Sequence, residues 1–99
     1  MDSRADFIRK LKAFKSSIEK DFPVDKMILF GSRAHGKLHK NSDVDLIIVS
    51  QKFGRLTFFK RGAKMYNYWG LRLPVDFLCY SPAEFKKKIK QSSIIRQAV

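Results

Sequence analysis

Hydrophobic positions recur at helical spacing in two long segments of the chain. In residues 3–20 the pattern predicts an amphipathic helix with a basic opposite face; its apolar positions are Phe7, Leu11, Phe14 and Ile18. In residues 56–69 a second stripe predicts another helix, with glycines near its ends; its members are Leu56, Phe59, Ala63, Tyr66 and Trp69. We interpret the side chains of Tyr66, Tyr68 and Trp69 as core or partner surface.

Three shorter apolar runs predict buried β-strands. Residues 27–30 form a run that Gly31 stops, and residues 43–49 are rich in β-branched side chains. Residues 73–80 form the third run, and its proline stands near the start, where a strand tolerates the missing N–H group. A loop is expected between the second strand and the helix that follows, in residues 51–55.

The segment after the third strand begins with Ser-Pro-Ala-Glu, which predicts a helix entry. Ser81 can cap the helix, Pro82 suits its first position, and Glu84 completes a capping box. Short helical turns are also expected in residues 32–40 and 94–99.

The predicted order is α-β-α-β-α-β-α in a single domain spanning residues 1–99. A short connection joins the first two strands, which suits antiparallel pairing. A helix of about fourteen residues separates the second and third strands, which suits a right-handed parallel crossover. The sequence therefore predicts an α/β (α+β) fold, a small mixed sheet of at least three strands with helices packed on it.

The composition indicates a folded protein but leaves several types of partner open. The 99 residues are 44% hydrophobic and 13% aromatic, which is enough apolar material for a folded core. No stretch reaches the roughly 20 apolar residues of a transmembrane helix, and no apolar segment follows the early charges, so we expect no membrane association, no secretory signal and a cytoplasmic location. The net charge of +12 favours a nucleic acid, a triphosphate or an acidic protein as partner.

The sequence also limits the type of metal that could bind. It contains one cysteine and two histidines, too few soft ligands for a structural zinc site. Cys79 lies in an apolar run and is expected to be buried and unreactive. Any metal must therefore be held by carboxylates.

The predicted topology brings three chemically notable segments to one edge of the sheet. Gly31-Ser32 lies where the first strand ends, and Asp43 and Asp45 lie where the antiparallel second strand begins. Asp76 lies near the start of the third strand, which runs parallel to the second. Because Asp43 and Asp45 are two residues apart on a strand, their side chains share one face.

These residue types suit a metal-bound triphosphate. Neighbouring carboxylates repel each other unless a cation neutralises them, and hard divalent cations prefer oxygen ligands. Asp76 would complete a three-carboxylate cage able to bridge two Mg²⁺ ions for in-line displacement at phosphorus. Gly31 lets the backbone approach a ligand closely, and the N–H groups after Ser32 could cradle a phosphate. Arg33 and Lys37 are candidates for neutralising phosphate charge.

Each feature has an ordinary explanation when taken alone. Asp-x-Asp is commonly a turn or cap pair, and Gly-Ser is common in turns. Asp76 could be a charge that keeps an edge strand soluble, and Arg33 could be a solvated surface cation. Requiring Gly-Ser, ten residues and then Asp-x-Asp gives a chance expectation on the order of one in a thousand for a chain of this length. The combination therefore favours nucleotide chemistry.

Two runs of sequence resemble a known family. Phe-Gly-Ser-Arg-Ala-His-Gly at residues 30–36 and Ser-Asp-Val-Asp-Leu at residues 42–46 are similar to the minimal nucleotidyltransferases (MNT proteins) of bacteria and archaea, within the DNA polymerase beta-type nucleotidyltransferase superfamily. The resemblance covers about residues 24–85 and includes Val-Asp-Phe at residues 75–77 as the strand of the third carboxylate. Members often carry arginine where this chain has His35.

The resemblance implies a polymerase beta palm-like fold and nucleotidyl transfer. A nucleoside monophosphate would pass from an NTP, by family default ATP, to an acceptor hydroxyl, with release of pyrophosphate. By resemblance to the matching positions of the family, Asp43 and Asp45 would hold two Mg²⁺ ions, and Asp76 would bind the catalytic ion and help to deprotonate the acceptor. Contacts to the nucleotide would come from Gly31, Ser32 and Arg33.

The resemblance also implies a partner. MNT proteins are often encoded beside a HEPN-family protein, so the chain is expected to be the antitoxin of a toxin–antitoxin pair, transferring AMP to a tyrosine of the HEPN toxin. Two alternatives stay open: an antitoxin that neutralises its partner by contact alone, and an enzyme or binding protein that acts on nucleic acid. The last is less favoured because no aromatic–basic signature such as an RRM motif accompanies the charge. A homo-oligomer also stays open.

Overall fold

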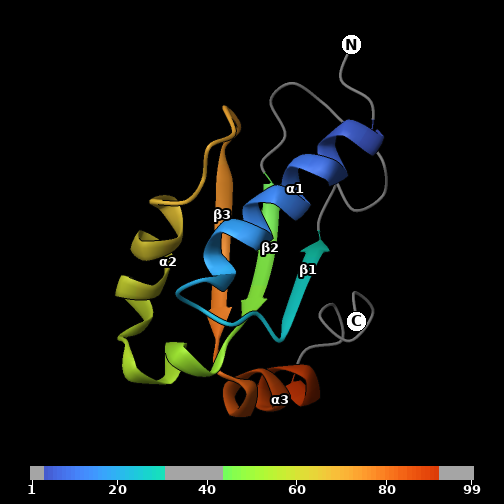
Figure 1. The fold of residues 1–99 in the computed structure, drawn as a ribbon. Helices are drawn as coiled ribbons and strands as arrows, with labels where there is room; N and C mark the ends of the chain where they lie inside the picture. The colour runs from blue at the N-terminus through green and yellow to red at the C-terminus, as the bar shows by residue number, and fades with distance from the viewer. Residues whose placement is uncertain (1–3, 31–43, 92–99) are drawn as a thin grey trace.

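The computed structural model describes residues 4–30 and 44–91, which form a three-stranded sheet with helices around it (Figure 1). In chain order the elements are α1 Arg4–Glu19, β1 Lys26–Phe30, β2 Val44–Val49, the 3-10 helix η2 Gln51–Arg55, α2 Phe58–Tyr66, β3 Val75–Tyr80 and α3 Pro82–Gln91. Within these two ranges, no helix is both long enough and apolar enough to cross a bilayer. Residue 3 of the first predicted helix and the turns predicted in residues 32–40 and 94–99 lie outside the described residues.

The sheet has the order β1-β2-β3, with β1 antiparallel and β3 parallel to β2. Both pairings confirm the prediction made from the connection lengths. The register aligns Ile28 with Ile47 and Ile47 with Leu78, so these three side chains form one row across the sheet. The predicted mixed α+β architecture is confirmed.

Alternation along the strands gives the sheet two different faces. On the first face, alternate residues of β2 and β3 join the main core with α1 and α2; the strand residues are Val44, Leu46, Ile48, Val75, Phe77 and Cys79. On the second face, Ile47, Val49 and Tyr80 form a smaller cluster with Phe85 of α3. Figure 1 shows α1 in front of the strands, α2 beside β3 and α3 below the carboxyl ends of β2 and β3.

The predicted stripe of α1 is buried against an aromatic cluster. Phe7, Leu11, Phe14 and Ile18 are all buried in the main core. The ring of Phe14 meets Trp69 edge-on at 5.0 Å and stacks on Phe77 at 5.7 Å, and the indole Nε1 of Trp69 donates to the carbonyl of Leu73 at 2.9 Å. These contacts attach α1 to the strand that carries Asp76, so the packing supports the candidate site.

A buried arginine joins η2, α2, β3 and α3 at the other end of the sheet. Arg61 is only 5% exposed, and its guanidinium donates to the carbonyls of Leu56 and Cys79, each at 3.0 Å. It also forms a two-pronged contact with the carboxylate of Glu84, at 2.6 and 3.1 Å. Glu84 accepts the backbone N–H of Ser81 while its own N–H donates to the Ser81 hydroxyl, which confirms the predicted capping box.

Two local predictions were wrong. Residues 51–55 form the 3-10 helix η2 rather than a loop, because the Ser50 side chain accepts the N–H of Lys52 and the buried ring of Phe53 anchors the turn. The helix predicted over 56–69 is shorter, and part of its apolar stripe faces solvent: Phe59 is 86% exposed and Tyr66 53%. The inward side of α2 is instead occupied by Arg61 and Met65.

Candidate nucleotide site

Two of the predicted carboxylates are direct neighbours across strands. Asp45 on β2 and Asp76 on β3 are register partners in the parallel pair, and on the other side of β2 Asp45 is aligned with Phe30 of β1. Register partners on adjacent strands lie about 4.8 Å apart along the hydrogen-bonding direction. Because Ile47 and Tyr80 belong to the cluster on the second face, alternation places Asp45 and Asp76 on that same face.

The row Phe30–Asp45–Asp76 lies at the end of the sheet where β1 finishes and where β2 and β3 begin (Figure 1). Helix α3 packs at the opposite end of the second face, through Phe85 against Val49 and Tyr80. Asp76 is exposed and Asp45 is half-buried. A ligand can therefore reach Asp76 from solvent while the strand backbone fixes its position.

The other predicted site residues lie outside the described residues: Gly31, Ser32, Arg33 and Asp43. Their bonded neighbours Phe30 and Val44 are the last residue of β1 and the first of β2. Of the predicted site residues, the structure thus brings Asp45 and Asp76 together. The functional roles of these two and of the four residues outside the described ranges stay predictions.

The donor set suits a hard cation. In residues 4–30 and 44–91, no group of three or more His, Cys, Asp or Glu side chains is placed to hold a metal. The same part of the chain does supply two adjacent carboxylates, on Asp45 and Asp76, and oxygen ligands of this kind suit Mg²⁺. These two residues could therefore hold part of a magnesium site, with Asp43 as the predicted third ligand.

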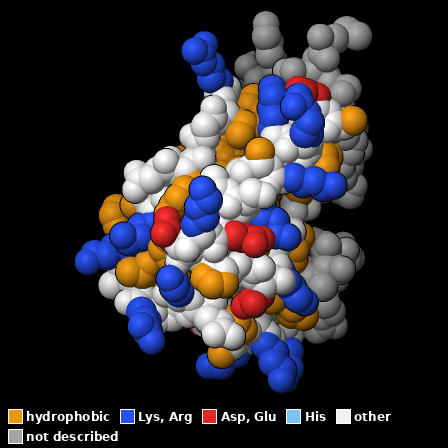
Figure 2. Space-filling model, viewed as in Figure 1, with side chains coloured by type: hydrophobic (Ala, Val, Ile, Leu, Met, Phe, Trp, Pro, Cys, Tyr) orange, Lys and Arg blue, Asp and Glu red, His pale blue; other side chains and the backbone are white. Residues whose placement is uncertain are grey.

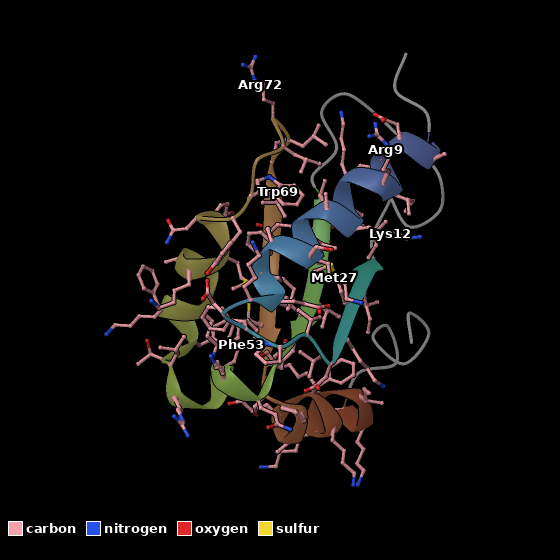
Figure 3. The ribbon with its side chains drawn as sticks, viewed as in Figure 1. Arg9, Lys12, Met27, Phe53, Trp69 and Arg72 are labelled. Atoms are coloured by element: carbon pink, nitrogen blue, oxygen red, sulfur yellow. The ribbon has the colours of Figure 1, made fainter. Side chains whose placement is uncertain are left out.

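Sequence reasoning missed one cation close to this end of the sheet. Arg72 lies three residues before β3, is exposed, and extends from the connection between α2 and β3 in Figure 3. Its position in the sequence, shortly before the predicted strand of Asp76, is the signal that could have identified Arg72 as a candidate. By contrast, Arg9 of α1 pairs with Asp6, and Arg9 together with Lys10 lowers the pKa of that carboxyl.

Cys79 takes no part in this arrangement. It is buried on the first face of the sheet, and burial raises the pKa of its thiol to about 12, although Arg61 opposes the shift. The protonated thiol is a poor nucleophile. The expectation that Cys79 is a buried core residue is confirmed.

Comparison with known proteins connects this geometry to a family. The family model described as "Nucleotidyltransferase domain" matches residues 11–99. The chain is 34% identical over 89 residues to a Methanocaldococcus jannaschii protein named "Putative protein adenylyltransferase", covering 90% of this chain and 86% of that protein.

Solved structures show the same fold. A crystal structure of a "putative nucleotidyltransferase" from Sulfolobus solfataricus matches with a TM-score of 0.65 and 22% identity, covering 85% of this chain and 75% of that one. BolA1 from Arabidopsis thaliana matches with a TM-score of 0.56 and 16% identity, covering 85% of this chain and 98% of that one. Because proteins with such different names share the fold, the fold alone does not identify the chemistry.

Proposed function

The chain belongs to the nucleotidyltransferase domain family, and we propose that it transfers AMP from ATP to a hydroxyl of an acceptor protein. The observation that carries this proposal is the alignment of Asp45 with Asp76 on one face of the sheet, at the end where β1 leads into Gly31-Ser32. The name of the M. jannaschii relative supports a protein acceptor and an adenylyl group. The net charge of +12 favours a triphosphate and an acidic acceptor.

The proposed reaction is an in-line substitution at the α-phosphorus of ATP. The acceptor oxygen forms a bond to that phosphorus, the bond from the phosphorus to the bridging oxygen of the β-phosphate breaks, and pyrophosphate leaves. The hydroxyl proton passes to Asp76 or to solvent. Asp43, Asp45 and Asp76 would hold two Mg²⁺ ions, which when bound offset the negative charge of the reacting phosphate groups. Gly31, Ser32 and Arg33 would contact the triphosphate.

The acceptor in this proposal is a tyrosine of a HEPN-family toxin, and the chain acts as its antitoxin in the cytoplasm. This assignment is supported by the resemblance of residues 30–36 and 42–46 to MNT proteins. Modification of a tyrosine near the toxin's active site would then neutralise the toxin.

One labelling experiment separates this function from its alternatives. The protein is incubated with Mg²⁺, each α-labelled NTP in turn, and either the protein encoded beside its gene or single-stranded RNA. An Asp43→Ala/Asp45→Ala variant serves as control. Label on the partner protein that disappears with the variant supports the proposal. Neutralisation by the variant, with no transfer by the wild type, would establish an antitoxin that works by contact. Label on RNA would indicate an enzyme that acts on nucleic-acid ends.

A further inference from the structure

Helix α2 presents an apolar stripe to solvent instead of to the core. The stripe consists of Phe59, Gly62, Ala63 and Tyr66, which recur at helical spacing and are here named the outer face of α2. Phe59 is 86% exposed and Tyr66 53%, whereas the opposite side of the helix is buried through Arg61 and Met65. An apolar helical stripe normally faces a packing partner. On α2 the described part of the chain covers only the Tyr66 end of this stripe, where the ring packs against Phe77.

Gly62 at the centre of this face has no explanation inside the chain. Glycine is among the least favourable residues in the interior of a helix, so its presence there needs a reason. A Cβ atom added at Gly62 would meet nothing within 4 Å, so no neighbour in the structure requires the missing side chain. Gly62 and Ala63 carry little or no side chain, so the backbone of another helix could approach α2 closely at these two positions.

The charged residues on α2 and just before it are all basic. Lys60 and Lys64 are exposed on one flank of α2, and Arg55 is exposed just before the helix. Between Asp45 and Asp76 the sequence contains six Lys and Arg residues and no Asp or Glu. Figure 2 shows hydrophobic and basic side chains together along the edge of the molecule where α2 lies in Figure 1.

The outer face is also tied to the strand that bears Asp76. The hydroxyl of Tyr66 donates to the carbonyl of Val75, and its ring meets Phe77 edge-on at 5.0 Å. Val75 and Phe77 are the two chain neighbours of Asp76 on β3, the edge strand of the described sheet. A protein held on α2 would therefore lie beside the strand that carries the proposed site.

We infer that the outer face of α2 is the docking surface for the acceptor protein, and that it binds an amphipathic helix with acidic residues along its margin. The identity of the partner as acceptor rests on the proposed function, whereas the surface itself is defined by exposure, charge and the small residues Gly62 and Ala63. The partner's apolar side chains would cover Phe59 and Tyr66, and its carboxylates would face Lys60 and Lys64.

Two other occupants fit the face less well. A second copy of the chain would bring the Lys60 and Lys64 side chains of both copies together, with no acid on this segment to offset them. Single-stranded nucleic acid could stack bases on Phe59 and Tyr66, but Gly62 and Ala63 offer neither a ring nor a charge to it. Two small residues on a helix surface allow close packing of another helix, so a helix fits this face better than a nucleic acid does.

The test measures binding and transfer separately. The protein is titrated with the protein encoded beside its gene, using wild type, Phe59→Ser, Gly62→Ala and Lys60→Glu/Lys64→Glu. Lys87→Glu/Lys88→Glu on α3 is the control, because it makes the same charge change at exposed positions away from α2. We expect roughly tenfold weaker binding for the three variants on the outer face and no change for the control.

Gly62→Ala gives a readout that a purely structural role would not. Alanine favours the helix, so the melting temperature of the isolated variant should rise by about 4 °C while its binding weakens. Equal binding by all variants, or no binding by the wild type, would overturn the inference. The inference would also be overturned if the partner does not bind and the substitutions on the outer face instead weaken binding of a 20-nucleotide RNA. The same holds if they instead abolish a dimer seen in sedimentation. If AMP transfer is the same for wild type and all variants, the docking surface alone is refuted. If the substitutions on the outer face weaken partner binding but no AMP is transferred, the proposed function alone is refuted.

Discussion

Replacing Arg61 by methionine should destabilise the protein more than any change at its other arginine or lysine positions in the described ranges. Arg61 is 5% exposed and donates four hydrogen bonds, to Leu56, Cys79 and both carboxylate oxygens of Glu84. Methionine fills similar space but removes every one of these donors. We expect a loss of about 3 kcal/mol, since breaking a buried ion pair costs about 3–5 kcal/mol and the partly exposed Glu84 can regain water.

Glu84→Gln separates the charge from the hydrogen bonds. The amide oxygen of glutamine can still accept from Arg61 and from the Ser81 N–H, but the negative charge is lost. In the wild type the hydrogen bond from Arg61, with help from Ser81, lowers the pKa of Glu84 from 4.5 to about 2. A shift of this size corresponds to about 3 kcal/mol at full strength. The Glu84 side chain is 46% exposed, so we reduce this to roughly 1–2 kcal/mol for solvent screening.

The pH dependence of this contribution has a definite sign. A depressed carboxyl pKa stabilises the folded state above the unfolded pKa near 4.5, and the benefit disappears as pH falls toward 2. Urea unfolding of wild type and Glu84→Gln should therefore differ by roughly 1–2 kcal/mol at pH 7 and converge only below about pH 2. A difference that stays constant over this range, or an Arg61→Met variant as stable as wild type, would refute the reasoning.

Three other predictions follow from the packing and the site. Phe53→Ala should cost about 3–5 kcal/mol in urea unfolding because the ring is fully buried, whereas Phe59→Ala should cost less than about 0.5 kcal/mol; equal losses would contradict the assigned burial. Cys79 should react with a thiol reagent at pH 8 only after urea unfolds the chain, and rapid labelling of the folded protein would contradict its raised pKa and burial. We expect the exposed Arg72 to contact the triphosphate, so Arg72→Ala should raise the KM for ATP about threefold with little change in kcat; an unchanged KM would contradict that contact.

Much of the fold could be predicted because each strand carries a local signal and each connection limits the pairing. The β-branched run that forms β2, and the helix between β2 and β3, were sufficient to predict the parallel neighbour. The same pairing then brought Asp45 beside Asp76, which are far apart in the sequence. The part of the candidate site that could be predicted is therefore the pair Asp45 and Asp76, whose proximity follows from the pairing of β2 with β3.

The orientation of α2 could not be predicted from its pattern. Periodicity identified the stripe that contains Phe59, Ala63 and Tyr66, but it does not say which side of a helix the rest of the chain will cover. Arg61 determines the orientation of α2, because its four hydrogen bonds reach Leu56 at the end of η2, β3 and α3 only when its side chain points inward. A buried arginine with long-range partners gives no periodic signal. The 3-10 helix η2 was missed for a similar reason, since its Ser50 cap and Phe53 anchor are tertiary features.

The central claim is that the carboxylates aligned on β2 and β3 carry out nucleotidyl transfer. The most direct test follows the transfer of label from α-labelled ATP to the partner protein with Mg²⁺, using wild type, Asp76→Asn and Asp25→Asn. Asp25 is an exposed aspartate immediately before β1, at the opposite end of the sheet, so it makes a matched control. We predict that Asp76→Asn loses at least about a hundredfold in rate while Asp25→Asn retains the wild-type rate. Equal rates for all three proteins would contradict the claim.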